Sequence, residues 1–411
     1  MTASRKIALV GSRRAFLTRS VLTVAAGLML VAPACLAKAQ TPNGDALSRL
    51  TPEQRQVYDG WRAARTAFET DYDAYWAVVD GRRDGRRKKR ATGQPFVAAD
   101  YIAIFPPKYA GPALPDAIAK AMVDPAQPIA PPPESQLPTV NDYRIAALTE
   151  HGFAPEQTTE IEFKRRYAAE ALAIGLTKDQ VIRVYALETG GNGTHDMQSG
   201  YHPVTRLGKP ISSALGYAQL LSGNSVGELL RYGEGFARRL DTMAATDQSG
   251  IPWRSASLRR KAGIVRTMVA DVKTVPDEWG AHVKFGGTPK GMAIHALNLD
   301  ADVGPWLQVI KLKGLKDTAA NEGGRVVLSG AEMELMNLAG PRTGLEMMTP
   351  LGRTIPTPNF FSRGGYERNS VVRERMASDL LLELGRRMEL GLLKPGSIEF
   401  AAAFDAVATG R

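Results

Sequence analysis

The chain has 411 residues, enough for two or three domains of about 100–200 residues each. Hydrophobic residues make up 44% of it and charged residues 23%, an ordinary globular usage that excludes a mostly disordered, collagen-like or multi-span membrane protein. The formal net charge is +10, but residues 1–39 hold six Lys or Arg and no Asp or Glu, so the remainder is only slightly basic. We therefore expect no nucleic-acid partner. Cys35, the only cysteine, lies in the same stretch, so the remainder has no thiol for a disulfide, a metal site or a nucleophile.

Residues 1–39 have the pattern of an export signal. A basic start is followed by an apolar stretch over residues 21–37 and by the small-x-small sequence Ala37-Lys38-Ala39. Residues 12–17 (SRRAFL) resemble the twin-arginine export motif. The alternatives are an uncleaved membrane anchor, for which the apolar stretch is short, and a lipoprotein attached through Cys35. We expect a signal peptide, and a periplasmic or secreted protein exported by the twin-arginine route.

Residues 40–104 are predicted to form a helical N-terminal segment. A helix is expected over residues 51–80, because Thr51 followed by Pro52 is typical of a helix start and aromatic residues recur at helical spacing. The helix leads into Arg82–Arg90, which holds seven cations in nine residues. This run indicates either a patch for an anionic envelope surface or a solvated, mobile segment after a helix.

The next segment, residues 105–139, is rich in proline. Ten of the 26 prolines lie between Phe105 and Pro138. Proline fixes φ and removes a backbone donor, so we expect an extended strap or linker here.

Residues 140–411 are predicted to form the main domain, which we expect to be mainly α. Capping boxes are predicted before three apolar runs, at Thr177–Gln180, Ser225–Glu228 and Ser329–Glu332. Strand signals are few and lie chiefly at Gly324–Leu328. Apolar residues at three- and four-residue spacing predict helices at Val140–His151, Glu160–Gly175, Leu176–Glu188 and about Val371–Leu393.

Glu188 is the first candidate for chemistry. It continues the apolar stripe of Val181, Val184 and Tyr185 at the end of the helix that Thr177 opens. Burial and the negative end of the helix dipole both disfavour a charged carboxylate, so both raise its pKa towards that of a general acid. The alternative is a terminal glutamate that reaches solvent or pairs with an arginine such as Arg183 or Arg206.

The residues that follow resemble a known family. Glu188-Thr189-Gly190, a polar loop and then Gly216-Tyr217-Ala218-Gln219-Leu220 resemble the catalytic core of the lysozyme-like soluble lytic transglycosylases. Residues 335–341 (LMNLAGP) resemble that family's Ala-Tyr-Asn-Ala-Gly-Pro segment. Met336 stands where the family has a tyrosine, for which Tyr366 is a candidate replacement.

The resemblance implies a lysozyme-like domain that cleaves peptidoglycan glycan strands, with Glu188 as the catalytic acid and then base. Gly216, Tyr217 and Gln219 match the glycan-binding segment, and Asn337 is a further candidate for a glycan contact. The glutamate of such enzymes protonates the oxygen between N-acetylmuramic acid and N-acetylglucosamine and then activates the C6 hydroxyl, which closes a 1,6-anhydro sugar.

Two other functions stay open. A muramidase-type hydrolase needs a second carboxylate, for which Asp196 is the candidate, although its setting in a polar loop favours a turn residue. A non-catalytic peptidoglycan-binding or envelope-scaffold protein is the other alternative. His195 and His202 flank Asp196 without a recognised ligand spacing, so we expect no metal and no other cofactor.

Overall fold

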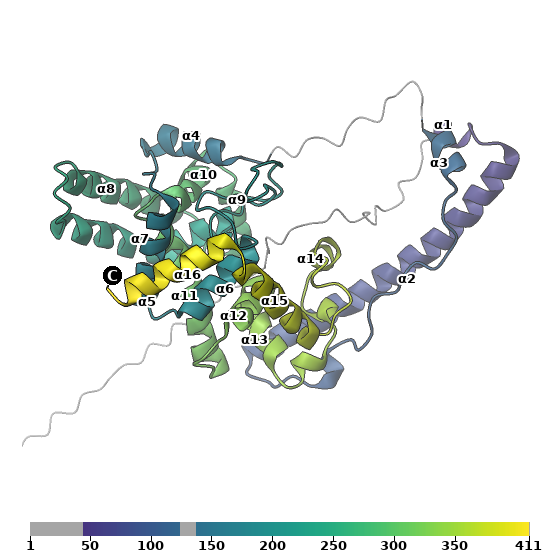
Figure 1. The fold of residues 1–411 in the computed structure, drawn as a ribbon. Helices are drawn as coiled ribbons and strands as arrows, with labels where there is room; N and C mark the ends of the chain where they lie inside the picture. The colour runs from purple at the N-terminus through teal and green to yellow at the C-terminus, as the bar shows by residue number, and fades with distance from the viewer. Residues whose placement is uncertain (1–43, 124–136, 411) are drawn as a thin grey trace, which may run out of the picture.

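The computed structural model describes residues 44–123 and 137–410 (Figure 1). Helices make up 66% of the described residues, which contain isolated β-bridges in place of extended strands. The prediction of a mainly α protein is confirmed. The signal peptide predicted for residues 1–39 lies outside the described residues, as does Cys35. Within the described ranges no helix combines the length and apolar character that crossing a bilayer requires.

The long N-terminal helix α2 (Pro52–Ala91) starts where the sequence predicts and continues well past residue 80. Thr51 caps it: the Thr51 hydroxyl accepts a hydrogen bond from the Gln54 N–H, and the Gln54 side chain accepts one from the Thr51 N–H. The basic run Arg82–Arg90 therefore lies on the helix. The short elements beside it in sequence are α1 (Gly44–Leu47), η1 (Ala98–Asp100) and α3 (Asp116–Met122).

The proline-rich segment is described on either side of residues 124–136. At its start the chain runs back along α2, where the Tyr75 hydroxyl donates to the Ile104 carbonyl at 2.9 Å and the Tyr109 ring meets Phe68 edge-on at 5.4 Å. The helix α3 interrupts the extended strap that the prolines predict.

From residue 140 onward, most predicted helices are confirmed within a few residues. They are α4 (Val140–His151), α5 (Glu160–Ala173), α6 (Lys178–Glu188) and, shorter than expected, α15 (Ala377–Leu392). The other elements are α7 (Ser222–Ala245), α8 (Arg254–Val272), α9 (Trp279–Gly286), α10 (Pro289–His295), η2 (Ala296–Leu299), α11 (Gly304–Gly323), α12 (Gly330–Ala339), α13 (Pro341–Met348), η3 (Gly352–Thr354), η4 (Thr357–Asn359), α14 (Arg363–Arg368) and α16 (Pro395–Ala408). The capping box predicted at Ser225–Glu228 is wrong, because α7 already begins at Ser222 and the Ser225 hydroxyl contacts His295 instead.

The strand predicted at Gly324–Leu328 is wrong. Gly324 ends α11 in the left-handed conformation with φ of +62°, and the chain then runs without a ladder to the cap of α12. Val326 and Val327 are exposed. The segment is instead held by the Gln180 side-chain amide, which donates to the Leu328 carbonyl at 2.9 Å. Two adjacent β-branched residues thus form a connection between helices, because no strand among the described residues lies beside them to pair with.

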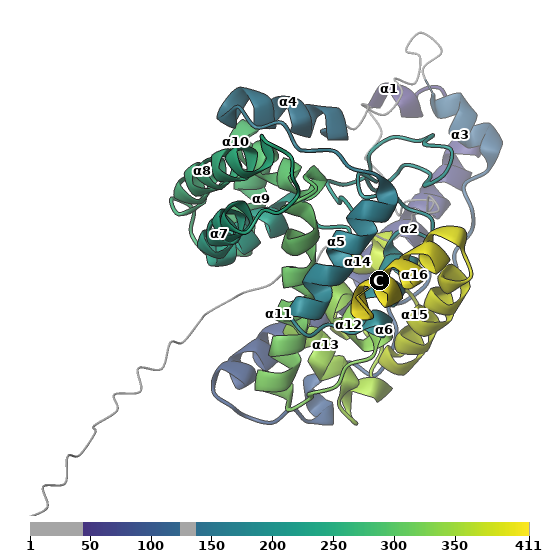
Figure 2. The same cartoon turned by 60° about the vertical axis from the view of Figure 1, so that its left-hand side comes forward.

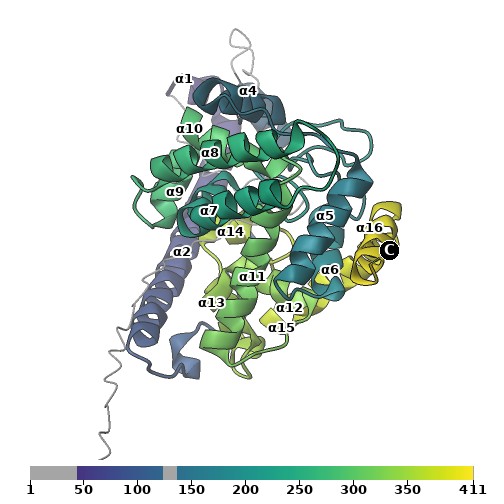
Figure 3. The same cartoon turned by 90° about the vertical axis from the view of Figure 1, so that its left-hand side faces the viewer.

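The domain buries two hydrophobic clusters that meet at α11. The first cluster is formed by α2, α5, α6 and α11 to α16, and the second by α4, α7, α8, α10, η2 and the start of α11. Leu312 and Leu315 belong to the first cluster, whereas Leu307 and Ile310 belong to the second. Figures 2 and 3 show α7 to α10 on one side, α12, α13 and α15 on the other, and α11 between them. Side chains on α11 can therefore contact both halves.

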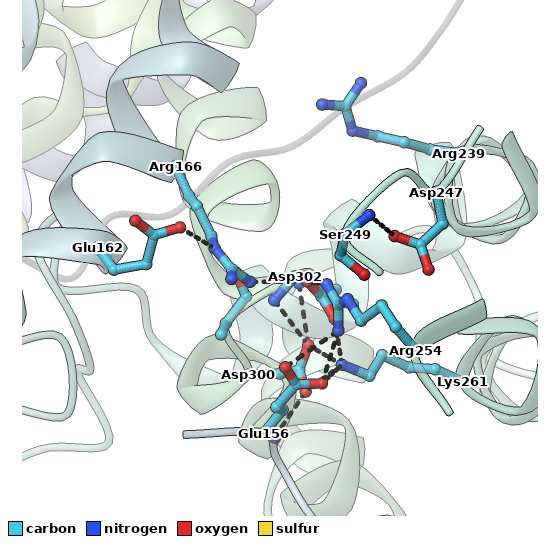
Figure 4. Close-up of polar contacts among 12 residues, drawn as sticks. Glu156, Glu162, Arg166, Arg239, Asp247, Ser249, Arg254, Lys261, Asp300 and Asp302 are labelled. Atoms are coloured by element: carbon cyan, nitrogen blue, oxygen red, sulfur yellow. Dashed lines mark hydrogen bonds and ion pairs between the residues drawn. The ribbon is translucent and has the colours of Figure 1, made fainter. Parts of the chain in front are cut away.

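A buried ionic network ties the second cluster to α5 (Figure 4). Lys261 Nζ on α8 lies 2.9 Å from Asp300 Oδ2 and 2.5 Å from Asp302 Oδ2. Arg254 and Arg166 also donate to Asp302, the latter at 2.8 Å. Both aspartate side chains are fully buried. Each negative charge has a cation in direct contact, which is the condition under which buried carboxylates are tolerated.

The basic run fixes α2 to the main domain. Arg86 Nε lies 2.8 Å from Glu346 Oε1 on α13, Arg90 pairs with the same carboxylate, and the Arg86 guanidinium lies 4.5 Å from the centre of the Tyr101 ring. Arg83 donates to the Phe361 carbonyl. The expectation of a solvated, mobile run is wrong for these side chains, because helical spacing places them on one face towards the domain. Three of the seven cations remain exposed: Arg82, Arg87 and Lys88.

Candidate active site

The helix α6 places Glu188. Its start is fixed by the predicted capping box, in which the Thr177 hydroxyl accepts from the Gln180 N–H at 3.3 Å and the Gln180 side chain accepts from the Thr177 N–H at 3.0 Å. Val184 and Tyr185 are each 1% exposed, and Glu188 is 8% exposed. The prediction that periodicity buries this carboxyl is confirmed.

The end of α6 is equally well defined. The Thr189 hydroxyl donates to the Tyr185 carbonyl at 2.7 Å, and Gly190 and Gly191 follow with φ of +62° and +75°. A Cβ on Gly191 would come within 2.3 Å of the Gly391 carbonyl oxygen. The chain therefore turns sharply after Glu188 against the end of α15, and only glycine fits that approach.

The helix α12 brings two further polar side chains to Glu188. Its start is a capping box between Ser329 and Glu332, as predicted. Asn337 Nδ2 donates to Glu188 Oε1 at 3.0 Å and lies 3.2 Å from Glu334 Oε2. Glu334 is 0% exposed. One amide group therefore bridges two buried carboxyl groups from different helices.

The electrostatics of the pair favour a neutral Glu188. Burial raises the pKa of Glu188 well above its ordinary value, and the neighbouring Glu334 carboxylate raises it further. Burial also raises the pKa of Glu334, to about 7. Neither carboxyl group has a Lys or Arg nitrogen within ion-pair distance in the described part of the chain. The alternative pairings fail, because Arg183 binds Asp179 and Glu389, and Arg206 binds Asp196.

Lys311 interacts with the pair from another helix, and Glu228 interacts with Lys311. Burial lowers the pKa of Lys311 on α11, while Glu188, Glu334 and Glu228 act against that change. Burial raises the pKa of Glu228 on α7, which has Arg231 at 3.7 Å. The site thus draws side chains from α6, α7, α11 and α12, at the junction of the two hydrophobic clusters.

The segment predicted to bind glycan is tied to the protein interior. Tyr217 is 1% exposed, its hydroxyl donates to Glu160, and its ring packs edge-on against Tyr185 at 4.9 Å. Gln219 is buried with φ of +43°, and its amide donates to the Gly216 carbonyl at 2.8 Å. These side chains therefore hold the loop after α6 against α5 and α6. Their burial offers a ligand little surface in this structure.

Gly216 has a backbone role. Its φ is +75°, and a Cβ there would lie 2.2 Å from the Gln308 Nε2 atom. Gln308 in turn accepts a hydrogen bond from the Ala218 N–H at 3.1 Å. The glycine permits a fully buried amide of α11 to hold the turn.

Asp196 belongs to the polar loop between α6 and α7. Burial opposes its ionisation, but hydrogen bonds from Thr194 and Arg206 outweigh that effect and lower its pKa. His195 beside it binds Glu160 through Nδ1 at 2.8 Å. The contacts of Asp196 are thus with its own loop and with Arg144 at 3.8 Å. In the described ranges no three His, Cys, Asp or Glu side chains are grouped as metal ligands would be.

The two residues discussed for the family tyrosine lie in the core. Met336 is 0% exposed, and its backbone packs on Gly344 of α13. The Tyr366 ring lies 5.6 Å from Trp76 of α2, and its hydroxyl accepts from the Glu374 N–H at 3.0 Å. Tyr366 therefore belongs to the contact between α2 and α14.

Sequence reasoning missed Glu334 and Lys311. The signal for Glu334 was available, because it stands inside the apolar run Met333-Glu334-Leu335-Met336, three residues before Asn337. Side chains three apart share a helix face. Lys311 follows Val309 and Ile310, and its direction depends on how α11 packs, which the sequence does not state.

The chain was compared with known families, curated proteins and solved structures. No family model, no curated protein and no solved structure matches the chain.

Proposed function

We propose that the protein is an exported peptidoglycan lytic transglycosylase in which Glu188 transfers the proton in both halves of the reaction. The observation that supports this most is the burial of Glu188 beside a second carboxyl group at the end of α6. A carboxyl group that stays protonated near neutral pH can act as a general acid. The choice of glycan rests on the resemblance of residues 176–221 and 335–341 to the lysozyme-like transglycosylases.

We also infer a lysozyme-like arrangement for residues 140–410. The resemblance implies a helix that ends in the acid, followed by a loop and the Gly-Tyr-Ala-Gln-Leu segment. Here α6, the loop with the Gln198–Leu215 and Leu215–Leu220 bridges, and α7 follow in that order. The site residues come from both hydrophobic clusters, which supports a two-lobed arrangement.

In the proposed reaction, protonated Glu188 gives its hydrogen to the oxygen between N-acetylmuramic acid and N-acetylglucosamine. The bond from C1 of the muramic acid to that oxygen breaks, and its electron pair leaves with the oxygen. The Glu188 carboxylate then takes the hydrogen of the C6 hydroxyl as the C6 oxygen forms a bond with C1. Glu188 ends in its starting protonation state, and no water is consumed.

The muramidase alternative needs a second carboxylate facing the sugar. Asp196 is held by Thr194 and Arg206 in its own loop, and Glu334 has no exposed surface. These placements favour a mechanism with one carboxyl group over hydrolysis with two.

The test is product analysis on purified sacculi with the mature protein and the Glu188→Gln variant. We expect 1,6-anhydro ends from the wild type and a loss of about 100- to 10,000-fold in the variant, the usual effect of removing a general acid. Glu150→Gln is the matched control, because Glu150 is exposed on α4.

Each other outcome points to a different function. Reducing ends would identify a hydrolase. Binding to sacculi without any product would identify a scaffold protein. Anhydro product formed at an undiminished rate by Glu188→Gln would remove Glu188 from the mechanism.

A further inference from the structure

The two carboxyl groups of the site are close enough to share one hydrogen. Asn337 Nδ2 lies 3.0 Å from Glu188 Oε1 and 3.2 Å from Glu334 Oε2. Glu188 and Glu334 also interact directly through their side chains. The second oxygen of Glu188, Oε2, is buried and has no donor partner in the described part of the chain. A hydrogen bound to Glu188 Oε2 would let this atom donate a hydrogen bond to Glu334.

The charged groups around the site favour keeping this hydrogen on Glu188. Lys311 is the cation that faces both carboxyl groups, at a separation longer than an ion pair, and Glu228 competes for it. Arg231 partly balances Glu228 at 3.7 Å. Three carboxyl groups and one lysine cannot all be charged in a buried site without a large cost in free energy. In the ionic network around Asp302, by contrast, every carboxylate touches a cation.

We propose that Glu334 is a positioning residue that accepts the acidic hydrogen of Glu188 in a hydrogen bond, while Asn337 fixes the two carboxyl groups side by side. This inference rests on the proposed function, since it gives Glu188 the role of acid. Glu334 itself has no exposed surface, so we assign it no contact with the substrate.

The arrangement suits a carboxyl group that works in both directions. Before the reaction, Glu334 holds the hydrogen on Glu188, so the acid is loaded at neutral pH. After Glu188 has given the hydrogen away, two carboxylates lie together in a buried site, and their repulsion makes Glu188 a stronger base towards the C6 hydroxyl. The net charge of the pair falls by one and then recovers, so no further proton source is needed.

The test compares Glu334→Gln with Glu228→Gln. Both variants remove one carboxylate near Lys311, but only Glu334 is bonded to Asn337 and paired with Glu188. We expect Glu334→Gln to move the alkaline limb of the rate profile for anhydro product about one to three pH units lower. Glu228→Gln should move it by a small fraction of that. An unchanged limb in Glu334→Gln would overturn the inference.

A second measurement needs no enzymatic activity. In protein with ¹³C-labelled glutamate carboxyl groups, the Glu188 and Glu334 signals are identified by their absence in Glu188→Gln and Glu334→Gln. We expect the Glu188 and Glu334 signals to titrate together, in steps that belong to the pair. A Glu188 signal that titrates alone near its ordinary value would overturn the inference. Coupled titration in a protein that releases no product from sacculi would refute the proposed function and the catalytic use of the pair, while showing the shared hydrogen.

Discussion

The ion pair between Arg86 and Glu346 offers a sharp test of how α2 is held. The two side chains are 3% and 4% exposed, and Arg86 also donates to the Asp100 carbonyl at 2.8 Å. In Arg86→Met the Glu346 carboxylate keeps a hydrogen bond with Tyr101 and an ion pair with Arg90, which is 30% exposed. Loss of one partner of a buried pair costs about 3–5 kcal/mol. Because Arg90 remains, we expect a loss of about 3 kcal/mol in the free energy of unfolding.

The assay is urea unfolding followed by tryptophan fluorescence. Trp76 of α2 is 2% exposed and packs on Tyr366, so its emission reports whether α2 is in place. Arg87→Met is the matched control on the same helix, since Arg87 is 56% exposed and pairs with Asp84 at the surface. Its loss should change the free energy of unfolding by about 0–1 kcal/mol.

A double variant separates charge from packing. Arg86→Met combined with Glu346→Leu removes both buried charges, and such replacements are often neutral in stability. We expect it to recover most of the loss. A single Arg86→Met variant within about 1 kcal/mol of the wild type would refute the reasoning, because the bare carboxylate would then carry no cost.

Three further outcomes are expected. Tyr217→Phe should lower the free energy of unfolding by about 1 kcal/mol through the lost bond to Glu160, and calorimetry on sacculi fragments should show unchanged glycan affinity. Gly216→Ala should lower the melting temperature in thermal unfolding, because its φ is +75° and the new Cβ would meet Gln308; an unchanged melting temperature would contradict this. The pKa of Glu334 is raised from 4.5 to about 7, so the folded protein binds this proton more tightly than the unfolded chain does. The resulting contribution to the free energy of unfolding is complete below pH 4.5 and is lost as the pH rises to about 7. Urea unfolding across that range should show a falling stability in the wild type and a flatter profile in Glu334→Gln.

Local signals in the sequence predicted much of the fold. The helix that carries Glu188 begins with a complete capping box, and its apolar stripe fixes which face is buried. The start of α4 at residue 140 was also predicted, from apolar spacing after the proline-rich segment, and Thr139 caps it in the structure. These features depend on residues within one or two turns of each other.

The features that the sequence did not predict depend on distant contacts. The extension of α2 through the basic run is stabilised by Glu346, more than 250 positions later in the chain. The Val326-Val327 pair indicated a strand, but a strand needs a neighbour, and tertiary packing supplies none. Glu334 reaches Glu188 only because α12 packs on α6, where a Cβ on Gly330 would lie 2.6 Å from that of Arg183.

The contacts between α2 and the main domain suggest that the protein can be produced as two separate polypeptides. The helix is joined to the domain by the Glu346 ion pairs and by ring contacts such as Trp76 with Tyr366, all of which are independent of the connection between α3 and α4. Two polypeptides produced separately, one ending after α3 and the other starting at α4, should therefore reassemble into a complementing pair. High salt should weaken that reassembly little, since the central charges are shielded from solvent.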